Sequence, residues 1–275
     1  MTIKGIGTTM FQWDKEFEKR GLDFDENIEQ VHKEIKEVGL DGVESRLSLA
    51  DTDEKALELK KICDNNNLKI ASLYGGCKLY DKKVVNDEIE NYIKSITSAK
   101  KSGCSLITLD MATPEDRKKT DEELRVQVDA LNKMGKELEK INMRVGIHNH
   151  TPEMENDARE FHYIMENLET DYVGVCLDIA WTVKAGVSPV ELIKKYHEKI
   201  FDVHVRNIQD KEFTQEITEG SISYPRIIEL LEKHDYNGWL VIELAYMEDT
   251  DVTRSFKENI NRSIWYLKGL TSSFK

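Results

Sequence analysis

The chain has 275 residues, 39% of them hydrophobic, which is enough for the core of one large domain, and α/β barrels reach this length as single units. A formal net charge of -13, from 52 acidic and 39 basic residues, argues against a protein that follows the phosphate backbone of a nucleic acid. Four widely spaced cysteines, an N-terminus without a long apolar segment and the absence of an apolar run of about 18 residues predict a reduced, cytoplasmic protein that does not enter a membrane.

Strand-like and helix-like segments alternate along the whole sequence. The expected strands cover residues 3–8, 41–46, 69–74, 106–111, 144–150, 173–178, 201–206 and 240–244. Helical spacing of apolar residues and capping signals predict helices over about 25–38, 52–66, 87–101, 121–140 and 158–168, one that begins at Ser188-Pro189, and two more over 224–233 and 253–268.

Eight strand-then-helix units indicate parallel strands joined by right-handed crossovers. The predicted fold class is therefore α/β, a (β/α)8 TIM barrel that forms a single domain over residues 1–275. The main alternative, a doubly wound open sheet, would carry Gly-x-Gly-x-x-Gly after its first strand, and this sequence has no such motif there.

Polar residues of four later strands fall at one end of the predicted barrel. In the strand over 144–150, alternation puts two imidazoles, His148 and His150, on one face. Three further strands carry Asp178, His204 and Glu243 near their carboxyl ends. Parallel neighbours bring His148, Asp178, His204 and Glu243 together at the end of the barrel where active sites lie.

Two imidazoles and two carboxylates suit one divalent transition metal ion. Calcium and all-oxygen magnesium sites prefer oxygen ligands alone. Buried carboxylates without partners are costly, and a cation would supply the partner. Because sugars coordinate through hydroxyl and carbonyl oxygens, manganese is the first choice, with cobalt, iron, zinc and magnesium left open.

Several segments resemble, in order and spacing, the sugar phosphate isomerase/epimerase family of xylose isomerase-like TIM barrels. They are His148-Asn149-His150, Leu177-Asp178-Ile179-Ala180-Trp181, Gly186-Val187-Ser188-Pro189, His204-Val205-Arg206, Glu219-Gly220-Ser221-Ile222 and Ile242-Glu243. The resemblance covers nearly the whole chain and is strongest from residue 144 onward. It implies one divalent metal ion at His148, Asp178, His204 and Glu243.

The resemblance also bears on the proton-transfer groups. Ketose epimerases of this family carry a glutamate at the strand-five position and use two metal-bound glutamates as their acid/base pair, whereas this sequence has His148 there. The chain looks instead like a branch with a Tyr-His-Asn-His type of fifth strand followed by a glutamate, here Glu153. In that branch, His150 or Glu153 serves as the second proton-transfer group. Inosose dehydratases and lyases of 3-keto sugars resemble these barrels too.

The expected function is that of a sugar isomerase or epimerase, which abstracts the proton next to a metal-bound carbonyl of a ketose or keto-sugar and forms an enediolate. The alternative is a dehydratase or lyase of inosose or a 3-keto sugar. The expected base is Glu243 or His150. Glu153 is the alternative base, and it could equally be a solvated loop acid beside Glu155.

Five residues are expected to bind substrate, and each has a structural interpretation beside the functional one. Arg206 would bind a substrate oxygen or pair with Asp178 or Glu243, and Glu44 would accept hydrogen bonds from sugar hydroxyls or pair with Arg46. The aromatic residues Trp13, Trp181 and Tyr74 would either form an apolar wall against the sugar or simply pack.

The expected partner is a small sugar or keto-sugar. No glycine-rich phosphate cradle is visible beyond Gly220, so the sequence gives no support to a phosphorylated substrate without excluding one. An AP endonuclease of the same barrel family would need three metals and a basic groove, which the acidic charge opposes. A noncatalytic sugar-binding barrel is the remaining alternative, and no sequence feature marks the interface of a homo-oligomer.

Overall fold

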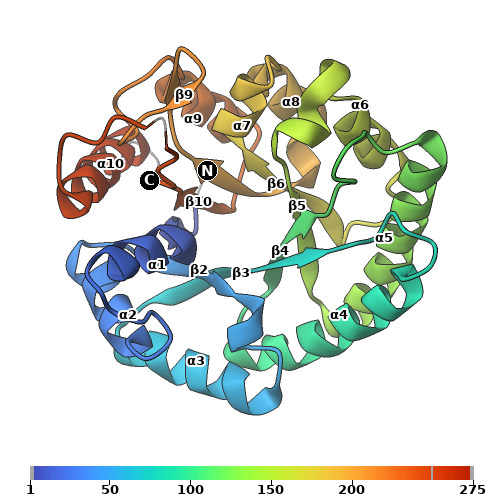
Figure 1. Ribbon diagram of the computed structural model, residues 1–275, viewed down its shortest axis with the longest axis horizontal. Helices are drawn as coiled ribbons and strands as arrows, with labels where there is room; N and C mark the ends of the chain where they lie inside the picture. The colour runs from blue at the N-terminus through green and yellow to red at the C-terminus, as the bar shows by residue number, and fades with distance from the viewer. Residues whose placement is uncertain (1–2, 249, 273–275) are drawn as a thin grey trace.

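Eight parallel strands close into a barrel, and helices surround it (Figure 1). The computed structural model describes residues 3–248 and 250–272, so both ends of the predicted 1–275 domain lie outside the described residues. The barrel strands are β1 (Gly5–Thr9), β2 (Gly42–Arg46), β3 (Lys69–Cys77), β4 (Leu106–Met111), β5 (Arg144–His148), β6 (Val173–Asp178), β7 (Ile200–Val205) and β10 (Trp239–Ile242). Their order is β1-β10-β7-β6-β5-β4-β3-β2, which confirms the predicted TIM barrel.

Ten α-helices and three short 3-10 helices occur among the described residues. The α-helices are α1 (Met10–Lys19), α2 (Ile28–Glu37), α3 (Asp53–Asn65), α4 (Val85–Ala99), α5 (Asp121–Ile141), α6 (Thr151–Asn167), α7 (Ile179–Lys184), α8 (Pro189–Tyr196), α9 (Tyr224–Lys233) and α10 (Phe256–Thr271). The 3-10 helices are η1 (Leu47–Leu49), η2 (Lys100–Ser102) and η3 (His197–Lys199). An antiparallel hairpin of β8 (Ile208–Gln209) and β9 (Glu212–Phe213) follows β7.

Side chains along each strand point alternately to the apolar core between strands and helices and to the interior of the barrel. Val145 and Ile147 of β5 are buried among the apolar side chains of the main core, as their spacing predicts. The longest helix, α5, begins with a capping box in which the side chains and backbone amides of Thr120 and Glu123 hydrogen-bond reciprocally. It then buries a stripe that includes Leu124, Val128, Leu131 and Leu138. Such stripes fix the helices around the barrel.

Two helices and the end of one strand differ from the sequence-based expectation. Helix α1 was not expected; it begins directly after β1 and buries Met10, Trp13 and Phe17. The short helix α7 was not expected either, and Asp178 caps it. Strand β5 ends at His148 rather than at residue 150, because His150 is already the N-cap of α6.

Helix α6 starts earlier than expected and is interrupted. Asn156, Asp157 and Ala158 have φ of 54°, 56° and 57°, in the left-handed region. Glycine is the residue that ordinarily occupies that region at no steric cost. The helix therefore consists of a first turn beside His150 and a longer segment beyond residue 158.

None of the helices among the described residues is both long enough and apolar enough to cross a membrane.

Candidate active site

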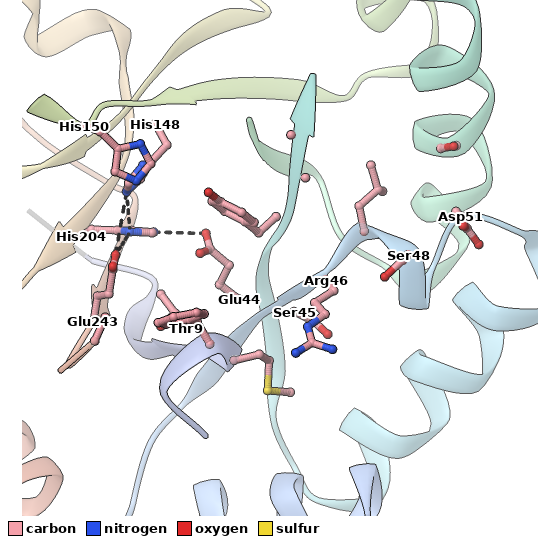
Figure 2. Close-up of a pocket in the computed structure, with 18 of the residues that line it drawn as sticks. Thr9, Glu44, Ser45, Arg46, Ser48, Asp51, His148, His150, His204 and Glu243 are labelled. Carbon is pink, nitrogen blue, oxygen red and sulfur yellow. Dashed lines mark hydrogen bonds and ion pairs between the residues drawn. The ribbon is translucent and has the colours of Figure 1, made fainter. Parts of the chain in front are cut away.

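Four ionisable side chains meet where strands β5, β6, β7 and β10 end. His148 and Asp178 are the last residues of their strands, His204 is the neighbour of Asp178 in the sheet register, and Glu243 follows β10 directly. One ligand atom from each of the four residues lies within 4.8 Å of the others. The Nε2 atom of His148 is 3.1 Å from Nδ1 of His204, which is 2.9 Å from Oε2 of Glu243 (Figure 2). The structure thus brings together the four predicted ligands.

The cluster leaves buried polar atoms without protein partners. Asp178 is fully buried; its Oδ1 accepts a hydrogen bond from the amide of Trp181. Its Oδ2 has no hydrogen-bond partner among the described residues and lies 3.9 Å from Nε2 of His148. Burial and the charge of Glu243 raise the pKa of Asp178 to about 6. The Nδ1 atom of buried His148 is also unpartnered, and burial together with the nearby His204 lowers the pKa of His148. An unpaired buried carboxylate is costly unless a cation neutralises it.

The donor set fits one divalent metal ion. Burial opposes ionisation of Glu243, but its contact with His204 and the charge of Arg206 hold the pKa of Glu243 below its usual value. A metal ligand must be deprotonated, and a carboxylate held in its charged form meets that requirement. Two imidazoles and two carboxylates of this kind could hold a divalent ion, with Asp178 Oδ2 as an oxygen that has no other partner.

A carboxylate from the opposite side of the barrel orients His204. Nε2 of His204 lies 3.1 Å from Oε2 of Glu44, and the hydroxyl of Ser72 donates to the same oxygen at 2.6 Å. Glu44 is 2% exposed and is the middle residue of β2. A carboxylate on one ring nitrogen fixes the tautomer and leaves Nδ1 to face the other donors. Burial alone would lower the pKa of His204, but Cys176, Glu44 and Glu243 raise it well above its usual value.

Arg206 forms an ion pair with Glu243, which is one of the two roles expected for it from the sequence. Its guanidinium lies 3.2 Å from Oε1 of Glu243 and donates to the carbonyl of Ala245 at 2.7 Å. The same group stacks on the ring of Phe213, 3.5 Å from the ring centroid. Arg206 is only 1% exposed and is not among the described residues that line the cavity. A direct contact between Arg206 and substrate therefore stays a prediction.

His150 stands beside the cluster on the cavity wall. Its ring centroid is 4.6 Å from that of His148, and its Nδ1 lies 3.3 Å from Oδ1 of Asp110 at the end of β4. Burial would lower the pKa of His150, but Asp110 raises it. The Asp110 contact leaves Nε2 as the ring nitrogen that can exchange a proton with a ligand.

Glu153 is not the solvated loop acid that one interpretation describes. It is 3% exposed, and its Oε2 accepts a hydrogen bond from the backbone amide of His150 at 2.8 Å. Burial and the charge of Glu160 raise the pKa of Glu153. Its described contacts make it part of the capping box of α6. Proton transfer by Glu153 is left as a prediction.

The cluster opens into a cavity of about 680 Å³. Among the residues that line it are Glu44, Tyr74, His150, Trp181, His204 and Glu243. The third predicted aromatic residue, Trp13, lies elsewhere: its indole donates to the hydroxyl of Thr8 at 3.1 Å and packs against Phe256. Trp13 is 2% exposed because α1 turns its apolar face into the core.

Two residues of the site were not assigned a role from the sequence. The side chain of Asn149 donates to the carbonyl of Asp178 and accepts from its amide, at 3.2 and 3.0 Å, so it ties the end of β5 to the end of β6. Asp110 contacts His150 as described above. Asp110 could have been found by the rule that identified the other ligands, because it is a polar residue near the carboxyl end of a strand.

The fold is that of a known family. Residues 33–268 match the model of the xylose isomerase-like TIM barrel, and the chain belongs to this family.

Among curated relatives, the chain is similar to an inosose dehydratase from Bacillus cereus, at 24% identity over 88% of this chain and 89% of the relative. A solved sugar phosphate isomerase/epimerase from Parabacteroides distasonis superposes with a TM-score of 0.76, at 18% identity over 95% of this chain and 96% of the other. The 3-keto-D-glucoside 4-epimerase from E. coli gives a TM-score of 0.70, at 20% identity over 94% and 98%. By their names, these three proteins are enzymes: a dehydratase of inosose, an isomerase/epimerase of sugar phosphates and an epimerase of a 3-keto-glucoside.

Proposed function

We propose that this protein is a divalent-metal-dependent enzyme that removes the proton beside the carbonyl group of a keto-sugar or a related cyclic ketone. The observation that carries the proposal is the four-donor cluster, in which one oxygen of Asp178 has no hydrogen-bond partner among the described residues, at the inner end of a cavity lined by His150. His148, Asp178, His204 and Glu243 would hold the ion. Manganese is our first choice, since the donors combine nitrogen with carboxylate oxygen.

The bound ion would act as a Lewis acid on the carbonyl and so acidify the neighbouring C–H group. The protein's own part is to place a base at that proton. Both oxygens of Glu243 are already engaged, with His204 and Arg206, whereas His150 lines the cavity and contacts Asp110 through Nδ1 alone. We therefore assign the base to Nε2 of His150, with Glu243 as the alternative.

Of the possible product-forming steps, elimination of water is the one that we prefer. In that step the base takes the α-proton, a C=C bond forms, the C–O bond at the β-carbon breaks and the oxygen leaves as water with a proton from a general acid. Two arguments support this preference: His148 stands where ketose epimerases of the family carry a glutamate, and the curated relatives in the comparison are inosose dehydratases.

Epimerisation or isomerisation is the second candidate, and the solved epimerases among the structural neighbours favour it. Both candidates share the first proton abstraction and differ only in the fate of the resulting enediolate. A return of the proton to the other face of the same carbon gives an epimer, and a return to the neighbouring carbon gives an isomer.

The test measures metal content and proton exchange on the purified protein and on Asp178→Asn. We expect about one divalent ion per chain, exchange of the α-proton of inosose or a 3-keto-hexose with deuterated water, and loss of water from at least one of these compounds. Asp178→Asn keeps an acceptor for the amide of Trp181 but should lose the ion and roughly a thousandfold of the activity.

Asp171→Asn is the matched control, because Asp171 is exposed and precedes the same strand at its opposite end. It should keep metal and activity. Exchange without loss of water would move the assignment to epimerase or isomerase. Sugar binding with no exchange in the metal-loaded protein would identify a noncatalytic binding barrel and refute the proposal.

A further inference from the structure

The cavity extends well beyond the four-donor cluster. His148, His204 and Glu243 lie at one end of the cavity in Figure 2, and Ser48 and Asp51 lie at the other. Its volume of about 680 Å³ falls in the middle of the range of about 300–1,000 Å³ that drug-sized ligands occupy. A single sugar ring held at the cluster would fill only the inner end.

Short polar side chains line the outer end. Ser48 follows β2 within η1, Asp51 lies just beyond it, and Asn91 and Ser95 come from the adjacent helix α4. The side chain of Asp51 is 34% exposed and contacts Lys55 at 2.9 Å through Oδ1 only. Hydroxyl, amide and carboxylate groups of this kind both donate to and accept from sugar hydroxyls.

Exposed apolar side chains also belong to the cavity wall. Phe11 is 49% exposed and Met247 is 38% exposed, and both line this cavity. Large apolar side chains that stay exposed beside a cavity mark ligand contacts more often than scattered surface residues do. An apolar surface together with short polar groups is complementary to a pyranose ring, which has a C–H face and an edge of hydroxyls.

Thr9 supplies an unpartnered hydroxyl on the same wall. Thr9 is 5% exposed, it lines the cavity, and its Oγ1 atom has no hydrogen-bond partner among the described residues. In the sheet register it is the neighbour of Glu44, next to the cluster. A buried hydroxyl without a partner costs free energy that a hydrogen bond to a ligand recovers.

The charges of the wall favour a neutral outer group over a phosphate. Arg46 is the one lysine or arginine among the described residues that line the cavity. Its guanidinium already pairs with Asp14 and Asp25 and covers the ring of Phe24. A phosphate would meet Asp51 and no unpaired lysine or arginine on this wall.

We propose that the outer end of the cavity is a subsite for a second sugar ring, so that the substrate is a keto-sugar linked to another sugar. The inference rests on the proposed function, since it takes the reacting ring to sit at the cluster. Ser48, Asp51 and Asn91 bind the hydroxyls of the second ring, and Phe11 packs against its C–H face.

The experiment compares one reaction on matched substrates with the metal-loaded protein. The probes are 3-keto-glucose and the disaccharides maltose, cellobiose and trehalose, each oxidised to a ketone at C3 of one non-reducing ring. The readout is kcat/KM for α-proton exchange. We expect at least one disaccharide to exceed 3-keto-glucose by about tenfold, which corresponds to about 1.4 kcal/mol of added binding. Asn91→Ala and Ser48→Ala should each reduce the disaccharide-to-monosaccharide ratio by about threefold to tenfold.

Thr97→Val is the matched control, because Thr97 is an exposed hydroxyl residue of α4 outside the cavity wall. It should leave the ratio unchanged. Equal kcat/KM for 3-keto-glucose and all three disaccharides would overturn the second subsite while leaving the proposed function intact. Exchange with none of the four probes would overturn the second subsite, and a failure of inosose to exchange as well would overturn the proposed function.

An aryl glycoside, the p-nitrophenyl derivative of 3-keto-glucose, separates a second sugar from an aromatic substituent. If it exceeds every disaccharide, and if Phe11→Ala removes that advantage while Asn91→Ala does not, the outer end binds an aromatic group and the assignment to a sugar is wrong.

Discussion

The two halves of the barrel mouth differ in the polar groups that they contribute. The half formed by β5, β6, β7 and β10 carries the four donors, and Asp178 Oδ2 and His148 Nδ1 have no hydrogen-bond partner among the described residues. The half formed by β1 to β4 contributes groups that hold others: Glu44 contacts His204, and Asp110 contacts His150. The comparison teaches that the candidate metal ligands lie in one half, while the other half supplies side chains that contact this half and lines the rest of the cavity.

The largest expected effect comes from His150 in the reacting half. His150→Gln should reduce kcat for proton exchange by about a hundredfold to ten-thousandfold, because a general base contributes that much, while metal content stays unchanged. Asp110→Asn should cost less, about tenfold, because the imidazole remains in place. Single-turnover exchange in deuterated water measures both.

His162→Gln is the control on the same helix, since His162 faces Tyr196 rather than the cavity. If His150→Gln kept full exchange activity, the base would be Glu243. One residue would then act both as base and as metal ligand.

The next effect tests the link between the halves. Glu44→Gln should weaken binding of Mn²⁺ by about tenfold to hundredfold, the usual cost of removing a carboxylate behind a metal-binding histidine. Ser72→Ala, which removes only the hydroxyl that donates to Glu44, should weaken binding less. Competition against a chelator gives both affinities. A Glu44→Gln variant that keeps its metal affinity but loses sugar affinity would show that Glu44 contacts substrate directly.

The smallest effect concerns a histidine outside both halves. His32 of α2 is fully buried, its Nδ1 lies 2.7 Å from the carbonyl of Ile28, and burial lowers its pKa. As the pH falls through about 6.5, His32 therefore binds a proton in the unfolded chain, whereas in the folded chain it stays neutral until a lower pH. This part of the stability is present above about pH 6.5 and is lost as the pH falls toward the depressed pKa, by at most about 1.4 kcal/mol per pH unit.

His32→Gln should flatten this part of the pH dependence, since glutamine does not titrate. Unfolding by urea at pH 7.5, 6.5 and 5.5 measures the difference between the two proteins. Parallel pH profiles would mean that the acid sensitivity arises elsewhere, including the histidines of the barrel mouth.

The barrel was predictable because the period of two in the strands and the capping of helices such as α5 are local signals. Helix α1 escaped prediction for a physical reason. It begins at Met10 without a loop after β1, and its N-cap Thr9 makes no side-chain capping hydrogen bond. The turn at His150 escaped too, because the capping box with Glu153 ends β5 two residues early.

In the site, strand alternation was enough to bring His148, Asp178, His204 and Glu243 together. The pairing of His204 with Glu44, 160 positions apart in the sequence, arises because closure of the barrel brings the side chains of distant strands together in its interior. The direction taken by Arg206, toward Glu243, is likewise a matter of side-chain conformation. Strand alternation carries no information about such contacts.

The left-handed residues Asn156, Asp157 and Ala158 divide α6 into two mechanical parts. The first turn has His150 as its N-cap and is closed by the hydrogen bond from the His150 amide to Glu153. The later segment packs into the core through residues such as Phe161 and Ile164. An unbroken helix would transmit every shift of the outer layer to His150 as a rigid rod. Because the break separates these two parts, a change in how the outer segment packs need not move the first turn, which begins at His150.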